Sequence, residues 1–164
     1  HLARADVMAE GLAAEVLAAA RARGVTLATA ESCTGGLIAA ALTEVPGSSD
    51  VVDCGFVTYS NAAKTRMLGV SEATLAAHGA VSEAVAAEMA AGAQARSGAG
   101  MAVAVTGIAG PGGSEFKPEG RVCFGLATPE GVRTETVEFG SRGRRAVRAA
   151  TVEHALRMVL GALA

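Results

Sequence analysis

The chain has 164 residues, of which 51% are hydrophobic and 18% charged, and its formal net charge is -2. This composition excludes an intrinsically disordered chain, and the length fits one domain with a substantial buried core. A slightly negative chain is not expected to be a general nucleic-acid binder. Because the sequence shows no internal repeat or linker, we predict a single domain over residues 1–164.

Hydrophobic periodicity and turn residues predict the elements along the chain. In chain order the pattern predicts a helix at 5–23, a strand at 25–30, a helix at 36–45, a strand at 53–60, helices from near 60 to 68, at 71–78 and at 82–97, strands at 101–105, 121–128 and 132–139, and a last helix capped by Ser141. The last two strands flank Pro129-Glu130-Gly131, which is typical of a hairpin turn.

Helices that connect successive strands are typical of parallel sheets. The order of elements therefore predicts an α/β fold, a three-layer α/β/α sandwich with a mixed, mostly parallel sheet and one antiparallel hairpin. The residues of the last helix that we expect to face inward are Val147, Thr151, Ala155, Leu156, Val159 and Leu163.

The three cysteines, Cys33, Cys54 and Cys123, are far apart and form no C-x-x-C pair. A disulfide framework or a zinc site is therefore not expected, and a reducing, cytoplasmic setting fits better. No apolar run approaches the roughly 18 residues that a membrane-spanning helix needs. We expect a cytoplasmic protein that has no membrane partner.

The segment 28–36 is the most informative part of the sequence. A short apolar run ends at a hydroxyl-rich turn with Ser32, and two glycines then lead into an apolar helical run. Unpaired backbone N–H groups at the positive end of a helix suit a serine nucleophile with its oxyanion donors, or a bound phosphate. The alternative is that Ser32 or Thr34 only caps the helix. Glu31 is either a buried orienting group or an exposed charge, and Cys33 is expected to point away from Ser32.

Lys64 is a candidate for the base that a serine nucleophile needs. It lies in the first turn of a predicted helix, where the helix dipole and partial burial lower the pKa of an ammonium group. Tyr59, at the end of the preceding strand, could relay a proton or hold the lysine. The alternative is a solvated surface lysine and a core tyrosine. The histidines, at positions 1, 78 and 154, are poorly placed for a Ser-His-Asp triad.

A glycine-rich loop, residues 106–119, follows the buried strand at 101–105. Ligands of α/β sheets bind at this end of a strand, and glycines such as Gly107 and Gly110 let backbone N–H groups crowd an anion. The loop lacks the Gly-Lys-Ser/Thr signature of a P-loop. The alternative is a plain mobile connection.

Four arginines at the start of the last helix oppose the helix dipole, so an acidic ligand nearby would relieve that cost. They are Arg142, Arg144, Arg145 and Arg148. Arg148 borders the inward face of the helix, which makes it the best phosphate clamp of the four.

Several motifs occur together and in order. They are Ala30-Glu31-Ser32-Cys33-Thr34-Gly35-Gly36, Gly55-Phe56-Val57-Thr58-Tyr59-Ser60-Asn61 with Lys64, His78-Gly79-Ala80-Val81-Ser82, and Thr106-Gly107-Ile108-Ala109-Gly110-Pro111. Over nearly the whole chain they closely resemble the CinA C-terminal domain family, the nicotinamide-nucleotide amidases. The resemblance implies hydrolysis of nicotinamide mononucleotide to nicotinic acid mononucleotide and ammonia by a serine amidase without a metal or other cofactor.

Carried over by position, the resemblance implies that Ser32 is the nucleophile, Lys64 the general base and Tyr59 an assistant in proton transfer. The expected substrate-binding residues are Thr34, Gly35, Gly36, Thr106, Gly107, Gly110 and Arg148. The alternative function is a catalytically weak nucleotide-binding module associated with competence or DNA-repair proteins.

The partners expected from the sequence are a small-molecule nucleotide and further copies of the chain, because alanine-rich helices can pack closely between subunits. A dimer is the expected oligomer. The family also has longer members with an N-terminal domain, so fusion to such a domain in a longer parent is left open.

Overall fold

The structure is a computed structural model that describes residues 4–114 and 116–164. The strands are β1 (Leu27–Glu31), β2 (Val52–Val57), β3 (Met101–Gly107), β4 (Arg121–Thr128) and β5 (Gly131–Glu138). The helices are α1 (Arg4–Arg23), α2 (Leu37–Thr43), α3 (Asn61–Leu68), α4 (Glu72–His78), α5 (Glu83–Ser97) and α6 (Arg144–Leu163), with a short 3₁₀ turn η1 (Ser48–Asp50). The predicted order of helices and strands is confirmed.

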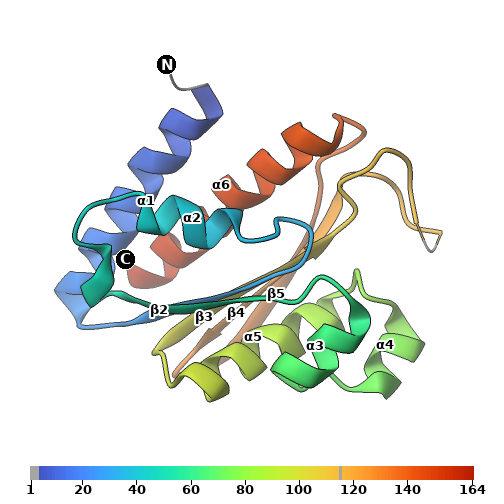
Figure 1. The fold of residues 1–164 in the computed structure, drawn as a ribbon, viewed down its shortest axis with the longest axis horizontal. Coiled ribbons are helices and arrows are strands. Elements are labelled where there is room, and N and C mark those ends of the chain that lie inside the picture. The colour runs from blue at the N-terminus through green and yellow to red at the C-terminus, as the bar shows by residue number, and fades with distance from the viewer. Residues whose placement is uncertain (1–3, 115) are drawn as a thin grey trace.

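The sheet has the strand order β2-β1-β3-β4-β5. Strand β1 pairs in parallel with β2 and β3, whereas β4 is antiparallel to both β3 and β5. Helices α1, α2 and α6 cover one face of the sheet, and α5 covers the other with α3 and α4 (Figure 1). The predicted three-layer α/β/α fold with a mixed sheet and a terminal hairpin is therefore confirmed.

Side-chain size differs between the two faces of the sheet. Along β3, Met101, Val103 and Val105 pack with α1, α2 and α6. The alternating positions, Ala102 and Ala104, pack toward α5, because successive side chains of a strand point to opposite faces. The small side chains let α5 lie close to the sheet.

The last helix confirms its predicted inward face but not its predicted cap. All six residues expected to face inward are buried. The predicted cap Ser141 is wrong, because α6 begins at Arg144 after Gly143, which has a φ of 91° and provides no side-chain cap. Gly140, with a φ of 83°, also turns the chain here, so the helix starts only after the second glycine.

No helix in the described ranges combines the length and the apolarity that a bilayer crossing requires.

The contact between α5 and α3 predicts a sharp effect of one added methyl group. A Cβ at Gly92 would lie 1.9 Å from the carbonyl oxygen of Leu68, the last residue of α3. We expect Gly92→Ala to destabilise the fold by about 2–3 kcal/mol, because the added methyl group can be accommodated only if α3 and α5 move apart. Gly11→Ala is the matched control, since nothing lies within 4 Å of its Cβ position in α1.

We expect the control to stabilise the protein by roughly 0.5–1 kcal/mol, the usual gain for alanine over glycine inside a helix. Urea unfolding monitored by circular dichroism measures both effects. A Gly92→Ala protein as stable as the wild type would contradict the proposed close contact.

Candidate active site

The carboxyl ends of the three parallel strands meet at one edge of the sheet. Glu31, the last residue of β1, pairs with Val57 of β2 and with Val105 of β3. Ser32 and Thr106 follow directly, and a cavity of about 360 Å³ opens between them and the glycine-rich loop. This is the edge at which open α/β sheets bind ligands.

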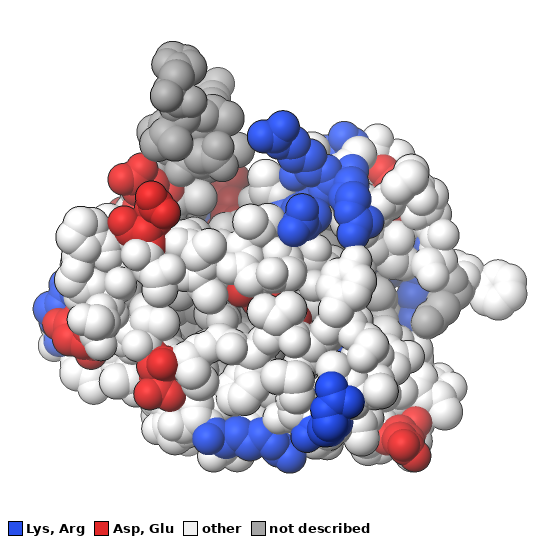
Figure 2. Space-filling view, in the orientation of Figure 1, with Lys and Arg blue, Asp and Glu red and all other residues white. Residues whose placement is uncertain are grey.

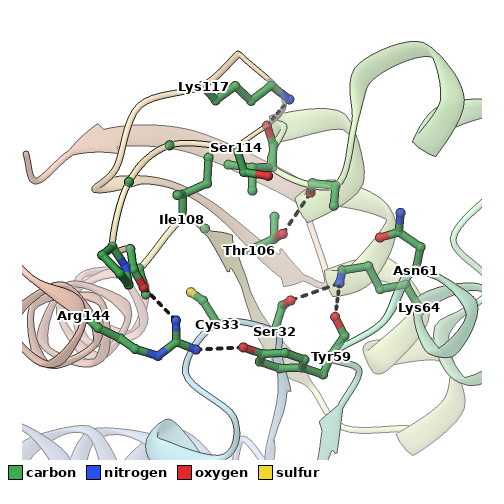
Figure 3. A pocket seen from close by; sticks show the side chains of 18 residues that line it. Ser32, Cys33, Tyr59, Asn61, Lys64, Thr106, Ile108, Ser114, Lys117 and Arg144 are labelled. Atoms are coloured by element: carbon green, nitrogen blue, oxygen red, sulfur yellow. Dashed lines mark hydrogen bonds between the residues drawn. The ribbon is translucent and has the colours of Figure 1, made fainter. Parts of the chain in front are cut away.

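Ser32 and Lys64 face each other at the bottom of this cavity (Figure 3). The Nζ of Lys64 lies 3.0 Å from the Oγ of Ser32, and the lysine is only 1% exposed. The same amine donates to the carbonyl oxygens of Thr58 and Tyr59, at 3.0 and 3.2 Å. Lys64 stands in the first turn of α3, which the side chain of Ser60 caps. A serine hydroxyl thus has a buried amine within hydrogen-bond reach.

Glu31 holds the turn that presents Ser32. Its fully buried carboxylate accepts hydrogen bonds from the Thr34 hydroxyl at 2.5 Å and from the amides of Ile38 and Ala39 at 2.9 and 3.0 Å. A carboxylate at this position satisfies N–H groups that the first turn of α2 leaves unpaired, and it complements the helix dipole. Of the two alternatives for Glu31, the structure therefore supports the buried orienting group.

Arg148 supports the serine turn from the side of α6. Its guanidinium donates to the carbonyl oxygens of Cys33 and Thr34, at 3.1 and 3.3 Å. Gly35 and Gly36 have φ values of 56° and 110°, and the Gly35 amide donates to the Ser32 carbonyl. The described residues that line the cavity do not include Thr34, Gly35, Gly36 or Arg148.

Arg144 occupies the place in the cavity wall that the sequence suggested for Arg148. Its guanidinium donates to the Tyr59 hydroxyl and to the Gly110 carbonyl, both at 2.8 Å (Figure 3). Tyr59 itself is 61% exposed, so it is no core residue. The sequence indicates Arg144 as one of four candidate arginines but favours Arg148, because the predicted helix start at Ser141 differs from the observed start after Gly143.

The predicted loop residues Thr106, Gly107 and Gly110 all line the cavity. The Thr106 hydroxyl donates to the Ala80 carbonyl at 2.8 Å, so it ties the end of β3 to the segment before α5. Gly110 has a φ of 94°, which a side chain would strain.

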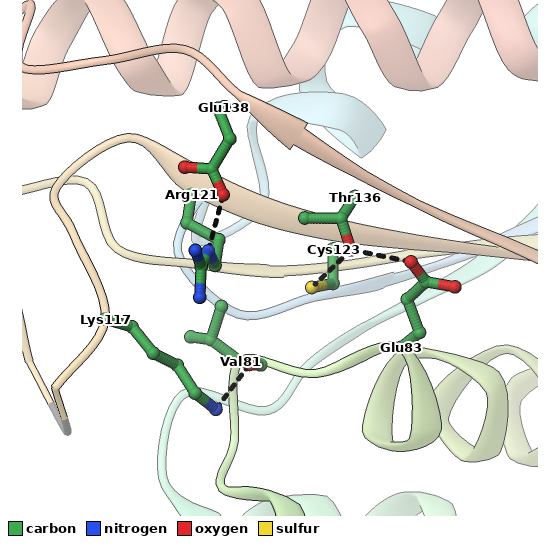
Figure 4. Close-up of polar contacts among 7 residues, drawn as sticks. All are labelled: Val81, Glu83, Lys117, Arg121, Cys123, Thr136 and Glu138. Atoms are coloured by element: carbon green, nitrogen blue, oxygen red, sulfur yellow. Dashed lines mark hydrogen bonds and ion pairs between the residues drawn. The ribbon is translucent and has the colours of Figure 1, made fainter.

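Two long-range contacts are made around the start of α5, on the side of the cavity where Val81 lies (Figure 4). Lys117 also lines the cavity, and its ammonium donates to the carbonyl oxygens of His78 and Val81, each at 2.6 Å. At the start of α5, the Glu83 carboxylate accepts from the hydroxyls of Thr136 and Thr134, each at 2.7 Å, and these bonds lower the pKa of Glu83. The glycine-rich loop is thereby fastened to the end of α4 and the segment before α5, and the hairpin to the start of α5.

Cys33 borders the cavity beside Ser32, whereas the sequence suggested that it points away (Figure 3). The residue is 6% exposed, and burial raises the pKa of its thiol to about 11. A thiolate is the reactive form of cysteine, so this thiol does not compete with Ser32 as a nucleophile near neutral pH.

The raised pKa of Cys33 predicts slow alkylation. At pH 8 a thiol with a pKa of about 11 is only about one-thousandth ionised. We therefore expect iodoacetamide to modify the half-buried Cys54 before Cys33, and the rate at Cys33 to rise with pH up to about 11. Peptide mapping by mass spectrometry measures both rates. Faster modification of Cys33 than of Cys54 at pH 8 would contradict the high pKa.

The fold and the cavity define an α/β domain with a polar site at the carboxyl edge of its sheet. The sequence model of the CinA C-terminal domain matches residues 9–163, and the chain belongs to this family. A solved structure, the competence/damage inducible protein CihA from Agrobacterium tumefaciens, has a TM-score of 0.91 and 52% identity over 95% of both chains. A CinA superfamily protein from Klebsiella pneumoniae has a TM-score of 0.92 and 40% identity over 94% of this chain and 97% of that one.

Curated relatives fall into a longer and a shorter group. A CinA-like protein from Chlorobium phaeobacteroides is 56% identical over 98% of this chain, which spans only 39% of that relative's length. The nicotinamide-nucleotide amidohydrolase PncC from Escherichia coli is 52% identical, and the match covers 89% of each chain.

Proposed function

We propose that this chain hydrolyses the carboxamide of nicotinamide mononucleotide, releasing ammonia and nicotinic acid mononucleotide, through a covalent intermediate on Ser32. The observation that carries the proposal is the buried Lys64 amine, 3.0 Å from the Ser32 hydroxyl. The similarity to PncC over 89% of both chains supports the substrate. The free cysteines support the expected cytoplasmic setting.

The surroundings of Lys64 favour its action as a base. Burial disfavours the charged form of an amine. In the structure the amine donates to the Ser32 hydroxyl and to the carbonyl oxygens of Thr58 and Tyr59. Once the amine has lost a proton, its lone pair can accept the Ser32 hydroxyl hydrogen across the same 3.0 Å, while two N–H bonds keep the carbonyl oxygens. Lys64 then takes the hydroxyl proton as Oγ attacks the carboxamide carbon. It gives this proton to the carboxamide nitrogen, which leaves as ammonia when the C–N bond breaks, and it next activates a water that cleaves the acyl-enzyme.

The turn after Ser32 supplies the proposed oxyanion donors. The Gly35 amide is engaged by the Ser32 carbonyl and Thr34 does not line the cavity, so we assign the main donor to the amide of Cys33, which does. Each such donor contributes roughly 3–4 kcal/mol to transition-state stabilisation in related chemistry. Tyr59 accepts a bond from Arg144, which leaves its own hydrogen to assist proton transfer.

We assign the substrate phosphate to Arg144 instead of Arg148, because Arg144 reaches the cavity and Arg148 is engaged by the serine turn. Arg142 and Arg145 are exposed beside it, and Figure 2 shows basic side chains gathered over the N-terminal end of α6. A positive potential at the mouth of a cavity attracts an anionic substrate.

Replacement of the two reacting groups tests the covalent mechanism. We expect Ser32→Ala and Lys64→Met each to lower ammonia release from nicotinamide mononucleotide by roughly a thousandfold or more. Ser141→Ala, an exposed serine at the turn before α6, is the matched control and should keep full activity.

Full activity of Ser32→Ala would eliminate the covalent mechanism. Tight nucleotide binding without turnover, unaffected by Lys64→Ala, would instead support the nucleotide-binding module. Assays with the nucleotide, the riboside and free nicotinamide side by side define the substrate.

Two arginine variants test the phosphate site. We expect Arg144→Gln to raise the KM for nicotinamide mononucleotide by about tenfold or more, since a charge-assisted bond is lost, and to leave the KM for the riboside unaffected. Arg145→Gln is the matched exposed control. Arg148→Gln should instead lower the melting temperature, because two carbonyl groups of the serine turn lose their donor. Equal KM changes for nucleotide and riboside in Arg144→Gln would refute the assignment.

A further inference from the structure

Glu119 joins two segments that border the cavity. It lies at the end of the glycine-rich loop, two residues before β4. Its Oε1 accepts from the Gly112 amide at 2.7 Å, and its Oε2 accepts from the Gly143 amide at 3.1 Å. Gly112 belongs to the loop that lines the cavity, and Gly143 directly precedes Arg144. One carboxylate therefore sets the distance between the loop and the start of α6.

The side chain of Arg144 makes a second connection between the start of α6 and the glycine-rich loop. Its guanidinium donates to the Gly110 carbonyl and to the Tyr59 hydroxyl, both at 2.8 Å. Gly110 packs directly on Glu119, because a Cβ at that position would lie 2.4 Å from the Cδ of the glutamate. Glu119 thus fixes both the backbone that carries Arg144 and the loop that its guanidinium contacts.

The charges at the start of α6 explain why an acidic group is needed here. Arg142, Arg144 and Arg145 oppose the helix dipole in this region. Gly143 has no side chain and provides no cap for the first turn of α6. Glu119 supplies from 24 positions away the negative charge that usually occupies a helix N-terminus.

We propose that Glu119 is a positioning residue that orients Arg144 for recognition of the substrate phosphate. The proposal rests on the proposed function, in which Arg144 binds that phosphate. Glu119 acts through Arg144 and the loop, not on the substrate.

Steady-state kinetics test this role. We expect Glu119→Ala to raise the KM for nicotinamide mononucleotide by about five- to tenfold with kcat changed by less than about twofold, and to leave kcat/KM for the riboside unchanged. Glu119→Gln keeps one acceptor oxygen and should fall between this variant and the wild type. The double variant with Arg144→Gln should be no worse than Arg144→Gln alone. Glu44→Ala, an exposed glutamate at the far end of α2, is the control.

A second measurement does not depend on turnover. Tyr59 is the single tyrosine in a chain without tryptophan, so intrinsic fluorescence reports on the partner of Arg144. We expect Glu119→Ala to change this emission in the same direction as Arg144→Gln, in proteins whose thermal unfolding remains cooperative. If the wild type releases no ammonia, the proposed function fails, and the emission still decides whether Glu119 holds Arg144.

Three results would overturn the proposal. One is unchanged emission in Glu119→Ala, whatever the activity. Another is an equal loss of kcat/KM for the nucleotide and the riboside, which indicates general damage to the site. The third is additive effects of Glu119→Ala and Arg144→Gln, which would show that the two residues act independently.

Discussion

The burial of one lysine amine constrains the whole site. An amine with 1% exposure is tolerated inside a protein only where polar groups meet it, and here the Ser32 hydroxyl and two backbone carbonyls do so. These groups come from the ends of β1 and β2, which pair in parallel. The helix that carries Lys64 is in turn seated on α5, where only a glycine at position 92 leaves room for its last carbonyl. The close packing of α5 and the chemistry of the cavity are therefore parts of one arrangement.

Much of this arrangement could be predicted from local sequence. Apolar periodicity, together with glycine and serine at the boundaries, indicates nearly every helix and strand, because these signals act over a few residues. The proximity of Ser32 and Lys64 agrees with the same signals, since Ser32 follows β1, Lys64 lies in the first turn of the helix after β2, and the two strands pair in parallel. The roles of the two residues stay predictions, as does that of Tyr59.

The remaining features depend on partners distant in the sequence. Spacing along α6 favoured Arg148 as a cavity residue, but the carbonyl groups of Cys33 and Thr34, more than a hundred positions away, engage it. The predicted helix cap is Ser141, whereas the observed cap position is Gly143. This difference has a similar cause, because the Gly143 amide donates to the distant Glu119 carboxylate and not to a neighbouring hydroxyl. The environment of Glu31 could not be predicted either, because the neighbouring residues do not indicate whether its carboxylate faces water or accepts from the amides of the next helix.

The pairing of β1 with β2 has a consequence for the newly made chain. Glu31 lies opposite Val57, and a slip of this ladder by one position would turn each following side chain to the other face of the sheet. The serine and the lysine then could not meet. The proposed chemistry therefore requires β1 and β2 to pair in this register, so the same ladder that shapes the sheet also sets the distance between the two reacting groups.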